Sequence, residues 1–149
     1  MGTTKLKLDS ISAFDSFFSD THLLGIISSQ KGYQICWRIN QTLDFDFRLD
    51  SENELEMSIQ KKGKHCFFQI YDCYEPINYT KHYIYSNHFK GEFLVPELKH
   101  IDYLWLIKGD FYEEKEIKVL MKDLRQMNNI QMVTPINAYS LRSKSNLII

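Results

Sequence analysis

The sequence has few cysteines and lacks the residue spacings that bind metals or form disulfide frameworks. Its 149 residues contain three cysteines, Cys36, Cys66 and Cys73, an odd number without a CxxC pair. The five histidines form no HExxH motif or other compact ligand spacing. Because zinc sites and disulfide frameworks show such spacings, we expect free thiols and no metal site.

Long apolar runs are also absent. The longest apolar clusters, at residues 23–27 and 103–107, are far shorter than the roughly 20 residues that a transmembrane helix needs. Residues 1–20 lack the uninterrupted apolar core of a signal peptide. The sequence therefore predicts a cytoplasmic protein with no membrane partner.

The chain carries no excess of one charge and none of the common nucleotide or acyl-transfer motifs. Lys and Arg number 18 and Asp and Glu 19, for a formal net charge of -1. This balance argues against a protein that mainly coats nucleic-acid phosphates. GxGxxG, P-loop and GxSxG motifs are missing, so we expect no cofactor and no enzyme of these classes.

Prolines and glycines are sparse, at three and six, and no linker rich in them divides the chain. A chain of this length can bury about 70% of its unfolded surface, enough for one core. We expect a single domain over residues 1–149 that ends in a short polar, basic tail, about residues 140–149. Aromatic residues are abundant, with nine Tyr, ten Phe and two Trp, which predicts a core or contact surface rich in rings.

Apolar and polar residues alternate through the middle of the chain, as in half-buried antiparallel strands. The alternation covers residues 45–49 and, after a turn at residues 50–53, residues 55–59. Both faces of residues 101–108 are apolar, which indicates a strand covered on both sides. The other predicted strands are residues 5–8, 23–29, 65–71, 81–87, 93–95 and 130–136, the last with Ile130, Met132, Thr134 and Ile136 alternating.

Residues 33–43 fit both a strand and a helix. As a strand, the odd-numbered residues from Tyr33 to Ile39 share one face; as a helix, Ile35, Cys36, Ile39 and Leu43 fall within about 100°. We favour the helix, because Leu43 fits only that pattern.

A second helix is predicted near the C-terminus. Asp110 and Glu113 resemble a capping box at its start, and its apolar residues fall within about 120° of the helix circumference. The order of elements predicts an α+β fold, a mostly antiparallel sheet with two main helices packed on one face. The apolar helix residues are Ile117, Leu120, Met121, Leu124 and Met127.

The segment VPELKHIDY, residues 95–103, is the most distinctive in the chain. Pro96 cannot donate a ladder hydrogen bond and so ends or kinks the short strand before it. We expect Glu97 and Asp102 to fix this corner by bonding backbone N–H groups or a nearby Arg or Lys. The alternatives are an acid–base constellation of Glu97, Asp102 and His100, for which no nucleophile, metal set or oxyanion hole is evident, and a binding role.

This segment resembles the signature that names the IPExxxVDY family, a set of small bacterial proteins. The resemblance implies membership in a group without an assigned reaction, and it therefore implies no activity. The matching residues are Pro96, Glu97, Asp102 and Tyr103, with Val95 and Ile101 in place of the Ile and Val of the signature.

Aromatic residues and lysines interleave between residues 61 and 90. We expect most of these rings to pack in the core under the helices. The alternative is that rings on the opposite sheet face, next to the lysines, form a platform that binds single-stranded nucleic acid or a partner protein. Nucleic acid is not favoured, because no RNP-like sequence is present. The residues of this candidate binding surface are Lys61, Lys62, Lys64, Phe68, Tyr83 and Tyr85.

The sequence as a whole predicts a non-catalytic interaction module that contacts an unidentified protein partner or itself. It has more rings than two helices can cover, so we expect an exposed apolar sheet face that self-associates. The rival hypothesis is a single-stranded nucleic-acid or small-ligand binder that uses the surface of rings and lysines. The acidic residues between Asp44 and Glu56 are most simply a solvated face, and they could also dock a basic partner.

Overall fold

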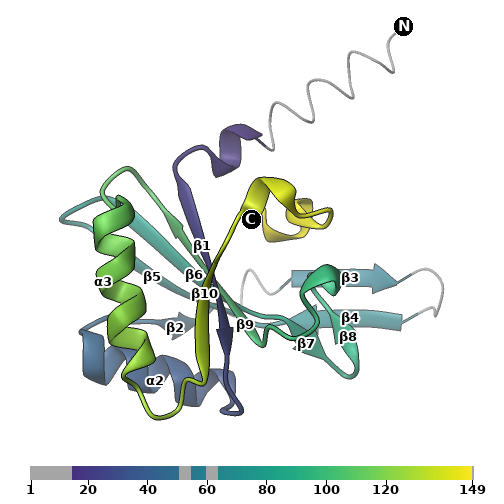
Figure 1. The fold of residues 1–149 in the computed structure, drawn as a ribbon. Helices are drawn as coiled ribbons and strands as arrows, with labels where there is room; N and C mark the ends of the chain where they lie inside the picture. The colour runs from purple at the N-terminus through teal and green to yellow at the C-terminus, as the bar shows by residue number, and fades with distance from the viewer. Residues whose placement is uncertain (1–14, 51–54, 60–63, 149) are drawn as a thin grey trace, which may run out of the picture.

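The computed structural model describes residues 15–50, 55–59 and 64–148. Its centre is a six-stranded antiparallel sheet in the order β10-β1-β9-β6-β5-β2, with two-stranded sheets β3–β4 and β7–β8 beside it (Figure 1). The strands are β1 (Thr21–Ile27), β2 (Arg48–Leu49), β3 (Leu55–Ile59), β4 (Lys64–Phe68), β5 (Ile70–Glu75), β6 (Thr80–Ser86), β7 (His88–Phe89), β8 (Glu92–Phe93), β9 (Tyr103–Lys108) and β10 (Met132–Ile136). The main helices are α2 (Gly32–Leu43) and α3 (Glu114–Arg125), residues 15–18 form one further helical turn, and the 3-10 turns are η1 (Pro96–Leu98), η2 (Ala138–Ser140) and η3 (Lys144–Leu147).

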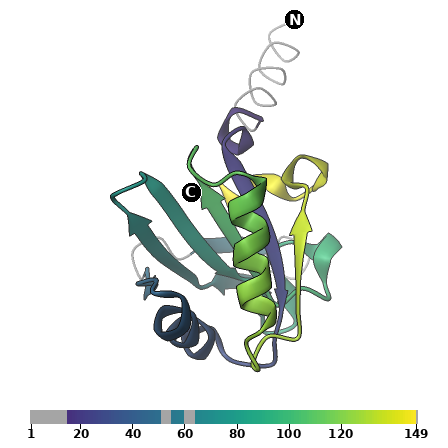
Figure 2. The ribbon, with the colours of Figure 1, turned by 60° about the vertical axis from the view of Figure 1, so that its left-hand side comes forward.

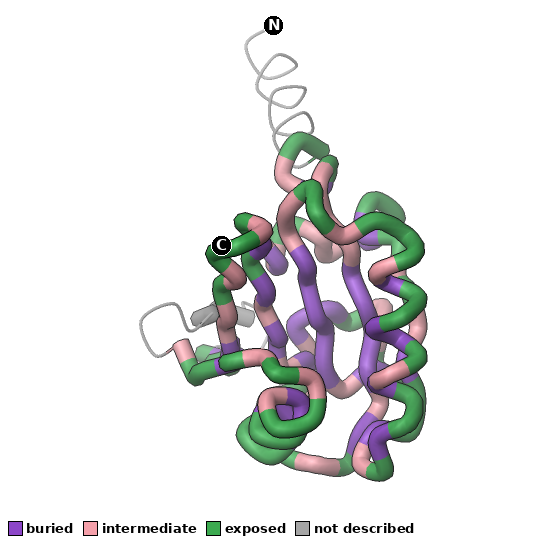
Figure 3. Tube along the Cα trace, turned by 90° about the vertical axis from the view of Figure 1, so that its left-hand side faces the viewer, coloured by how far each residue is buried: buried purple, intermediate pink, exposed green. Residues whose placement is uncertain are grey.

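Helices α2 and α3 cover one face of the sheet, as the turned view in Figure 2 shows. Ile35 and Ile39 of α2 and Leu120 and Leu124 of α3 are buried in one cluster with alternate residues of the sheet. The buried parts of the chain are concentrated in the strands, whereas the outer sides of the helices are exposed (Figure 3). The predicted α+β fold with two main helices on one face is confirmed, and residues 33–43 are helical as expected.

Strand β9 lies in the interior of the sheet and is buried on both faces, as its sequence predicted. Trp105 and Ile107 point to the cluster under the helices, whereas Leu104 and Leu106 belong to a second cluster on the opposite face. Successive side chains of a strand point to opposite faces, so a strand with two apolar faces requires a layer on each side.

The opposite face of the sheet is covered by a layer that the sequence reading did not foresee. Phe18, Phe68, Leu94, Leu141 and Leu147 are buried there against the sheet. The expected exposed apolar sheet face is therefore wrong, because the turn that holds Phe18, strand β4, the segment after β8 and the polar C-terminal tail cover this face in place of long helices.

The prediction of a strand over residues 45–49 is only partly correct. Only Arg48 and Leu49 form a strand, β2, and it pairs with β5. Asn40 explains the difference: its side-chain amide accepts from the Phe47 N–H (2.8 Å) and donates to the Phe47 carbonyl (3.0 Å). These bonds take the backbone groups that a longer strand would pair, while the rings of Phe45 and Phe47 lie 5.2 and 5.1 Å from that of Trp105.

Other element boundaries differ by a few residues. Helix α3 begins after Glu113, whose N–H donates to the side chain of Glu116 (3.0 Å), so the predicted start at Asp110 is too early. In β10 it is Val133, and not Met132, that is buried. Strand β3 pairs with β4 in a separate hairpin instead of continuing from β2. The predicted strand at residues 5–8 and turn residues 51–53 lie outside the described residues.

Candidate functional site

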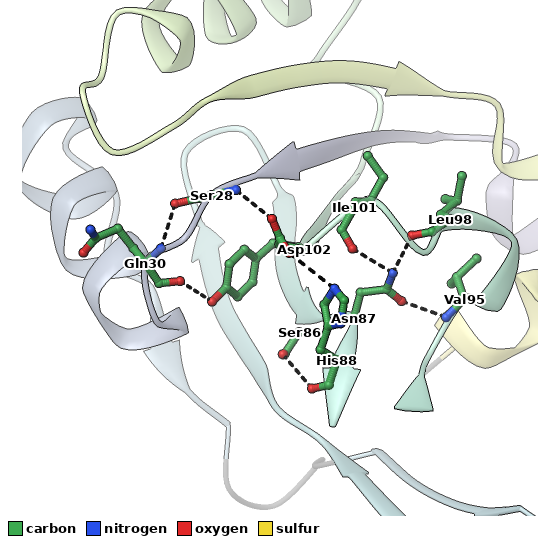
Figure 4. A network of polar contacts seen from close by, with 10 residues as sticks. Ser28, Gln30, Ser86, Asn87, His88, Val95, Leu98, Ile101 and Asp102 are labelled. Carbon is green, nitrogen blue, oxygen red and sulfur yellow. Dashed lines mark hydrogen bonds and ion pairs between the residues drawn. The ribbon is translucent and has the colours of Figure 1, made fainter. Parts of the chain in front are cut away.

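The corner at residues 95–103 is built around a side chain that the sequence reading missed. Asn87 is fully buried at the end of β6, and its Nδ2 donates to the carbonyls of Leu98 and Ile101, both at 2.9 Å. Its Oδ1 accepts from the Val95 N–H at 2.8 Å (Figure 4). One amide therefore holds both ends of the η1 turn that Pro96 begins.

Asp102 and Tyr103 hold the connection between β1 and α2. The Asp102 carboxylate accepts from the Ser28 N–H (2.9 Å) and lies 3.3 Å from His88 Nε2 (Figure 4). The Tyr103 hydroxyl donates to the carbonyl of Gln30 (2.6 Å). Both side chains thus tie the start of β9 to the segment that leads into helix α2.

Glu97 holds a different segment, the C-terminal tail. Its carboxylate accepts from the Ser143 N–H at 2.8 Å. Partial burial alone would raise the pKa of Glu97, but hydrogen bonds from its own backbone, Ser143 and Arg142 lower it overall. Glu97 contacts the tail, whereas Asp102 contacts Ser28 and His88, so the two carboxylates are engaged with different segments, and His100 is exposed. Val95 and Ile101 are fully buried in the second cluster.

Replacing Glu97 by alanine is expected to lower the melting temperature by about 3–6 °C. The Ser143 N–H loses its acceptor, a cost of roughly 1–2 kcal/mol in a domain of this size. Thermal melts followed by circular dichroism measure the change. Glu97→Gln keeps an acceptor oxygen and should lose less; identical melting curves for all three proteins would contradict a bracing role.

A second polar cluster centres on His82, fully buried in β6 under the helices. Its Nδ1 accepts from Trp105 Nε1 at 3.0 Å, and its Nε2 contacts Glu75 Oε1. Indole nitrogen can only donate, so Nδ1 is unprotonated and the proton of the neutral ring is on Nε2. Burial lowers the pKa of His82, although the hydrogen bond and charge of Glu75 act to raise it.

Glu75 is the charged partner in this cluster. It also accepts from the Tyr112 hydroxyl (2.8 Å) and from Asn78 Nδ2 (3.2 Å). Burial alone would raise the pKa of Glu75, but these hydrogen bonds and His82 lower it overall. Both ring nitrogens of His82 have partners, so the cluster ties β6 to β5 through Glu75 and to β9 through Trp105.

A groove opens where the C-terminal end of α2 approaches α3. It is open to solvent and has a volume of about 690 Å³, and Leu43, Phe45, Tyr112 and Leu120 supply apolar surface to it. At its edge lie Phe111 and Val119, which are 51% and 59% exposed. A neighbouring hollow of about 510 Å³ shares Thr42, Leu43 and Asp123 with the groove and extends it along α2. We call the hollow of about 690 Å³ the helix groove.

The helix groove was not predicted, although one signal for it was present in the sequence. Val119 lies on the polar side of the predicted helix, away from Ile117, Leu120 and Leu124. A lone apolar residue on a polar helix face is common, and by itself it does not identify a site.

The candidate surface of rings and lysines is not assembled as predicted. Phe68 and Tyr85 are buried in the second cluster, and Tyr83 is only partly exposed. The rings of Phe68 and Tyr85 fill the layer between the sheet and its cover and cannot stack on a ligand. Lys61 and Lys62, together with the side chain of Lys64, lie outside what the structure describes.

The sequence matches no protein-family model and no curated protein. Membership in the IPExxxVDY family therefore stays a prediction. Within residues 15–50, 55–59 and 64–148, no group of three or more His, Cys, Asp or Glu side chains could hold a metal ion. In the same part of the chain, every helix is too short or too polar to cross a bilayer.

Proposed function

We propose that this chain is a non-catalytic interaction module that binds a segment of a partner protein in the helix groove. The observation that carries the proposal is the exposure of Phe111 and Val119 beside a hollow of about 690 Å³ with an apolar floor. Pockets that hold ligands have volumes of about 300–1,000 Å³ and mostly apolar linings. Exposed apolar residues around such a hollow favour a contact site.

The contacts of the conspicuous polar side chains support a non-catalytic role. Asn87, Glu97 and Asp102 bind backbone groups, and His82 has both ring nitrogens occupied. The thiol of Cys36 is buried, which raises its pKa to about 12 and keeps it protonated. A general acid, base or nucleophile needs an accessible reacting atom with a pKa suited to its task.

Self-association through the sheet has less support than a foreign partner. The sheet faces are covered, and edge strand β10 contains Pro135, which has no N–H to offer a neighbouring strand. The carbonyl of Val133 in β10 accepts from Arg125 Nη2 at 3.0 Å. The other edge, β2, has two residues. Short, blocked edges of this kind oppose pairing between sheets.

Binding of single-stranded nucleic acid is the weaker alternative. Its remaining support is a hollow of about 410 Å³ lined by Phe67, Phe89 and Lys90, with the Lys90 ammonium 5.3 Å from the centre of the Phe89 ring. Stacking platforms of nucleic-acid binders combine rings with basic residues, but the burial of Phe68 and Tyr85 removes two of the rings proposed for it.

Affinity purification of the full chain from its native cell tests the groove directly. Phe111→Asn combined with Val119→Asn removes apolar surface without adding charge, and Ile77→Asn, at a 97% exposed position outside the groove, is the matched control. We expect a partner identified by mass spectrometry to be retained by the wild type and by Ile77→Asn and lost, with binding at least ten-fold weaker, in the groove variant. The same proteins retained by all three chains would overturn the proposal.

A further inference from the structure

The helix groove carries an excess of acidic side chains around its apolar floor. Three carboxylates, those of Asp44, Glu116 and Asp123, line it, against one ammonium, that of Lys115. Lys115 is 3.9 Å from Glu116 and so offsets part of that charge. Among the described residues, Asp44 and Asp123 form no ion pair. The groove therefore presents negative charge to whatever enters it.

The carboxylate of Asp44 lies at a position whose backbone conformation favours a different residue type. Asp44 follows the last residue of α2 in the left-handed conformation, with φ 60° and ψ 37°. Glycine, and next asparagine, are the usual residues at such a helix end, because they adopt this conformation with the least strain. The chain thus places a carboxylate beside the groove at a position where a neutral residue would fit the backbone better.

The walls of the groove favour one backbone conformation for the occupant. An extended peptide pairs its N–H and C=O groups with an exposed strand edge, but the groove is lined by residues of α2, of α3 and of the segments that follow α2 and precede α3. A helix satisfies its own backbone hydrogen bonds and needs only apolar contact and charge from its receptor.

From these observations we infer that the occupant is an amphipathic helix of a partner protein with lysine or arginine beside its apolar stripe. Its apolar side chains contact Phe45, Phe111 and Val119, and its basic side chains face the carboxylates of the groove. This inference rests on the proposed function and adds the chemistry of the partner to it.

Calorimetric titration with two synthetic amphipathic helices tests the inference. One peptide is built of leucine and lysine, and the other has glutamate in place of every lysine. We expect the lysine peptide to bind the full chain about ten-fold or more tightly than the glutamate peptide at low salt. Asp44→Asn, Glu116→Gln and Asp123→Asn, combined in one variant, keep size and shape and should weaken lysine-peptide binding about ten-fold.

Two controls separate specific binding from general attraction between opposite charges. Glu114→Gln removes a charge from α3 outside the groove and should leave binding unchanged. The Phe111→Asn, Val119→Asn variant should lose lysine-peptide binding although its charge is unaltered. The inference is overturned if the Phe111→Asn, Val119→Asn variant retains lysine-peptide binding. It is also overturned if Glu114→Gln weakens this binding as much as the triple variant does.

The remaining outcomes distinguish the inference from the proposed function. The glutamate peptide could bind more tightly than the lysine peptide and lose this binding in the Phe111→Asn, Val119→Asn variant. That result would overturn the inference that the partner is basic, but it would leave the groove as the binding site. If neither peptide binds, the inference that an amphipathic helix occupies the groove is overturned. The proposed function itself is judged by the partner captured from the cell.

Discussion

Replacement of Asn87 by alanine is expected to lower the melting temperature by about 10 °C or more. The change leaves the buried Val95 N–H and Ile101 carbonyl without their partner, and it removes one of the two donors to the Leu98 carbonyl, which still accepts from the Ile101 N–H (3.0 Å). Each buried, unpaired backbone group costs about 1–3 kcal/mol, so these two groups together with the lost bond to Leu98 cost roughly 3–5 kcal/mol. In a domain of this size each kcal/mol lowers the melting temperature by about 2–4 °C.

A matched variant separates this effect from the loss of any asparagine. Asn146 donates one hydrogen bond, to the Leu94 carbonyl at 2.9 Å, and is only partly buried. Asn146→Ala is therefore expected to cost about 1 kcal/mol. Urea unfolding of both variants, at constant pH, measures the two free energies. Equal losses would mean that Asn87 does not hold the corner.

The parts of the fold that follow a single hydrophobic period could be predicted from the sequence. Strand β9 has apolar residues on both faces, and α3 has one apolar stripe, so each pattern requires a particular cover. These local patterns depend only on neighbouring residues, and they sufficed for the α+β class and for the side of the sheet on which the helices lie.

The features that could not be predicted from the sequence share one physical cause: each depends on contacts between segments that are distant in the chain. Asn40 binds the backbone of Phe47, and Asn87 binds that of residues 95–101. The sequence does not distinguish an exposed asparagine from a buried one that forms several hydrogen bonds. Leu141 and Leu147 follow no period, so their burial under the sheet is invisible before the tail is placed. The helix groove depends on the separation of two helices, which neither helix encodes by itself.

The contribution of His82 to the stability of the protein is expected to fall by up to about 2 kcal/mol between pH 7 and pH 5. Asp72 opposes part of this loss, because burial and the neighbouring Asp50 raise its pKa to about 6, so the folded protein takes up a proton there as the pH falls. In the unfolded chain this histidine takes up a proton near its ordinary pKa of about 6.5. In the folded protein burial lowers the pKa of His82, and Nδ1 is already bound to the Trp105 N–H. Protonation of the ring would break that bond.

The sign follows from proton linkage. Below pH 6.5 the unfolded state binds a proton that the folded state does not, so stability is full above this pH and falls by up to about 1.4 kcal/mol per pH unit below it. The loss continues until the pH reaches the lowered pKa of folded His82. Glu75 acts in the same direction at lower pH, because its pKa is also lowered and its carboxylate must be protonated below about pH 4.5 in the unfolded chain.

Urea unfolding at several pH values measures this slope, and a glutamine variant assigns it. His82→Gln retains an amide that can accept from Trp105 and donate to Glu75 but does not titrate, so the loss between pH 7 and pH 5 should largely disappear. His22→Gln is the control, since His22 is only partly buried and its Nε2 contacts the Tyr112 carbonyl at 2.8 Å. If His82→Gln keeps the wild-type slope, or if His22→Gln removes it, another group controls the acid sensitivity.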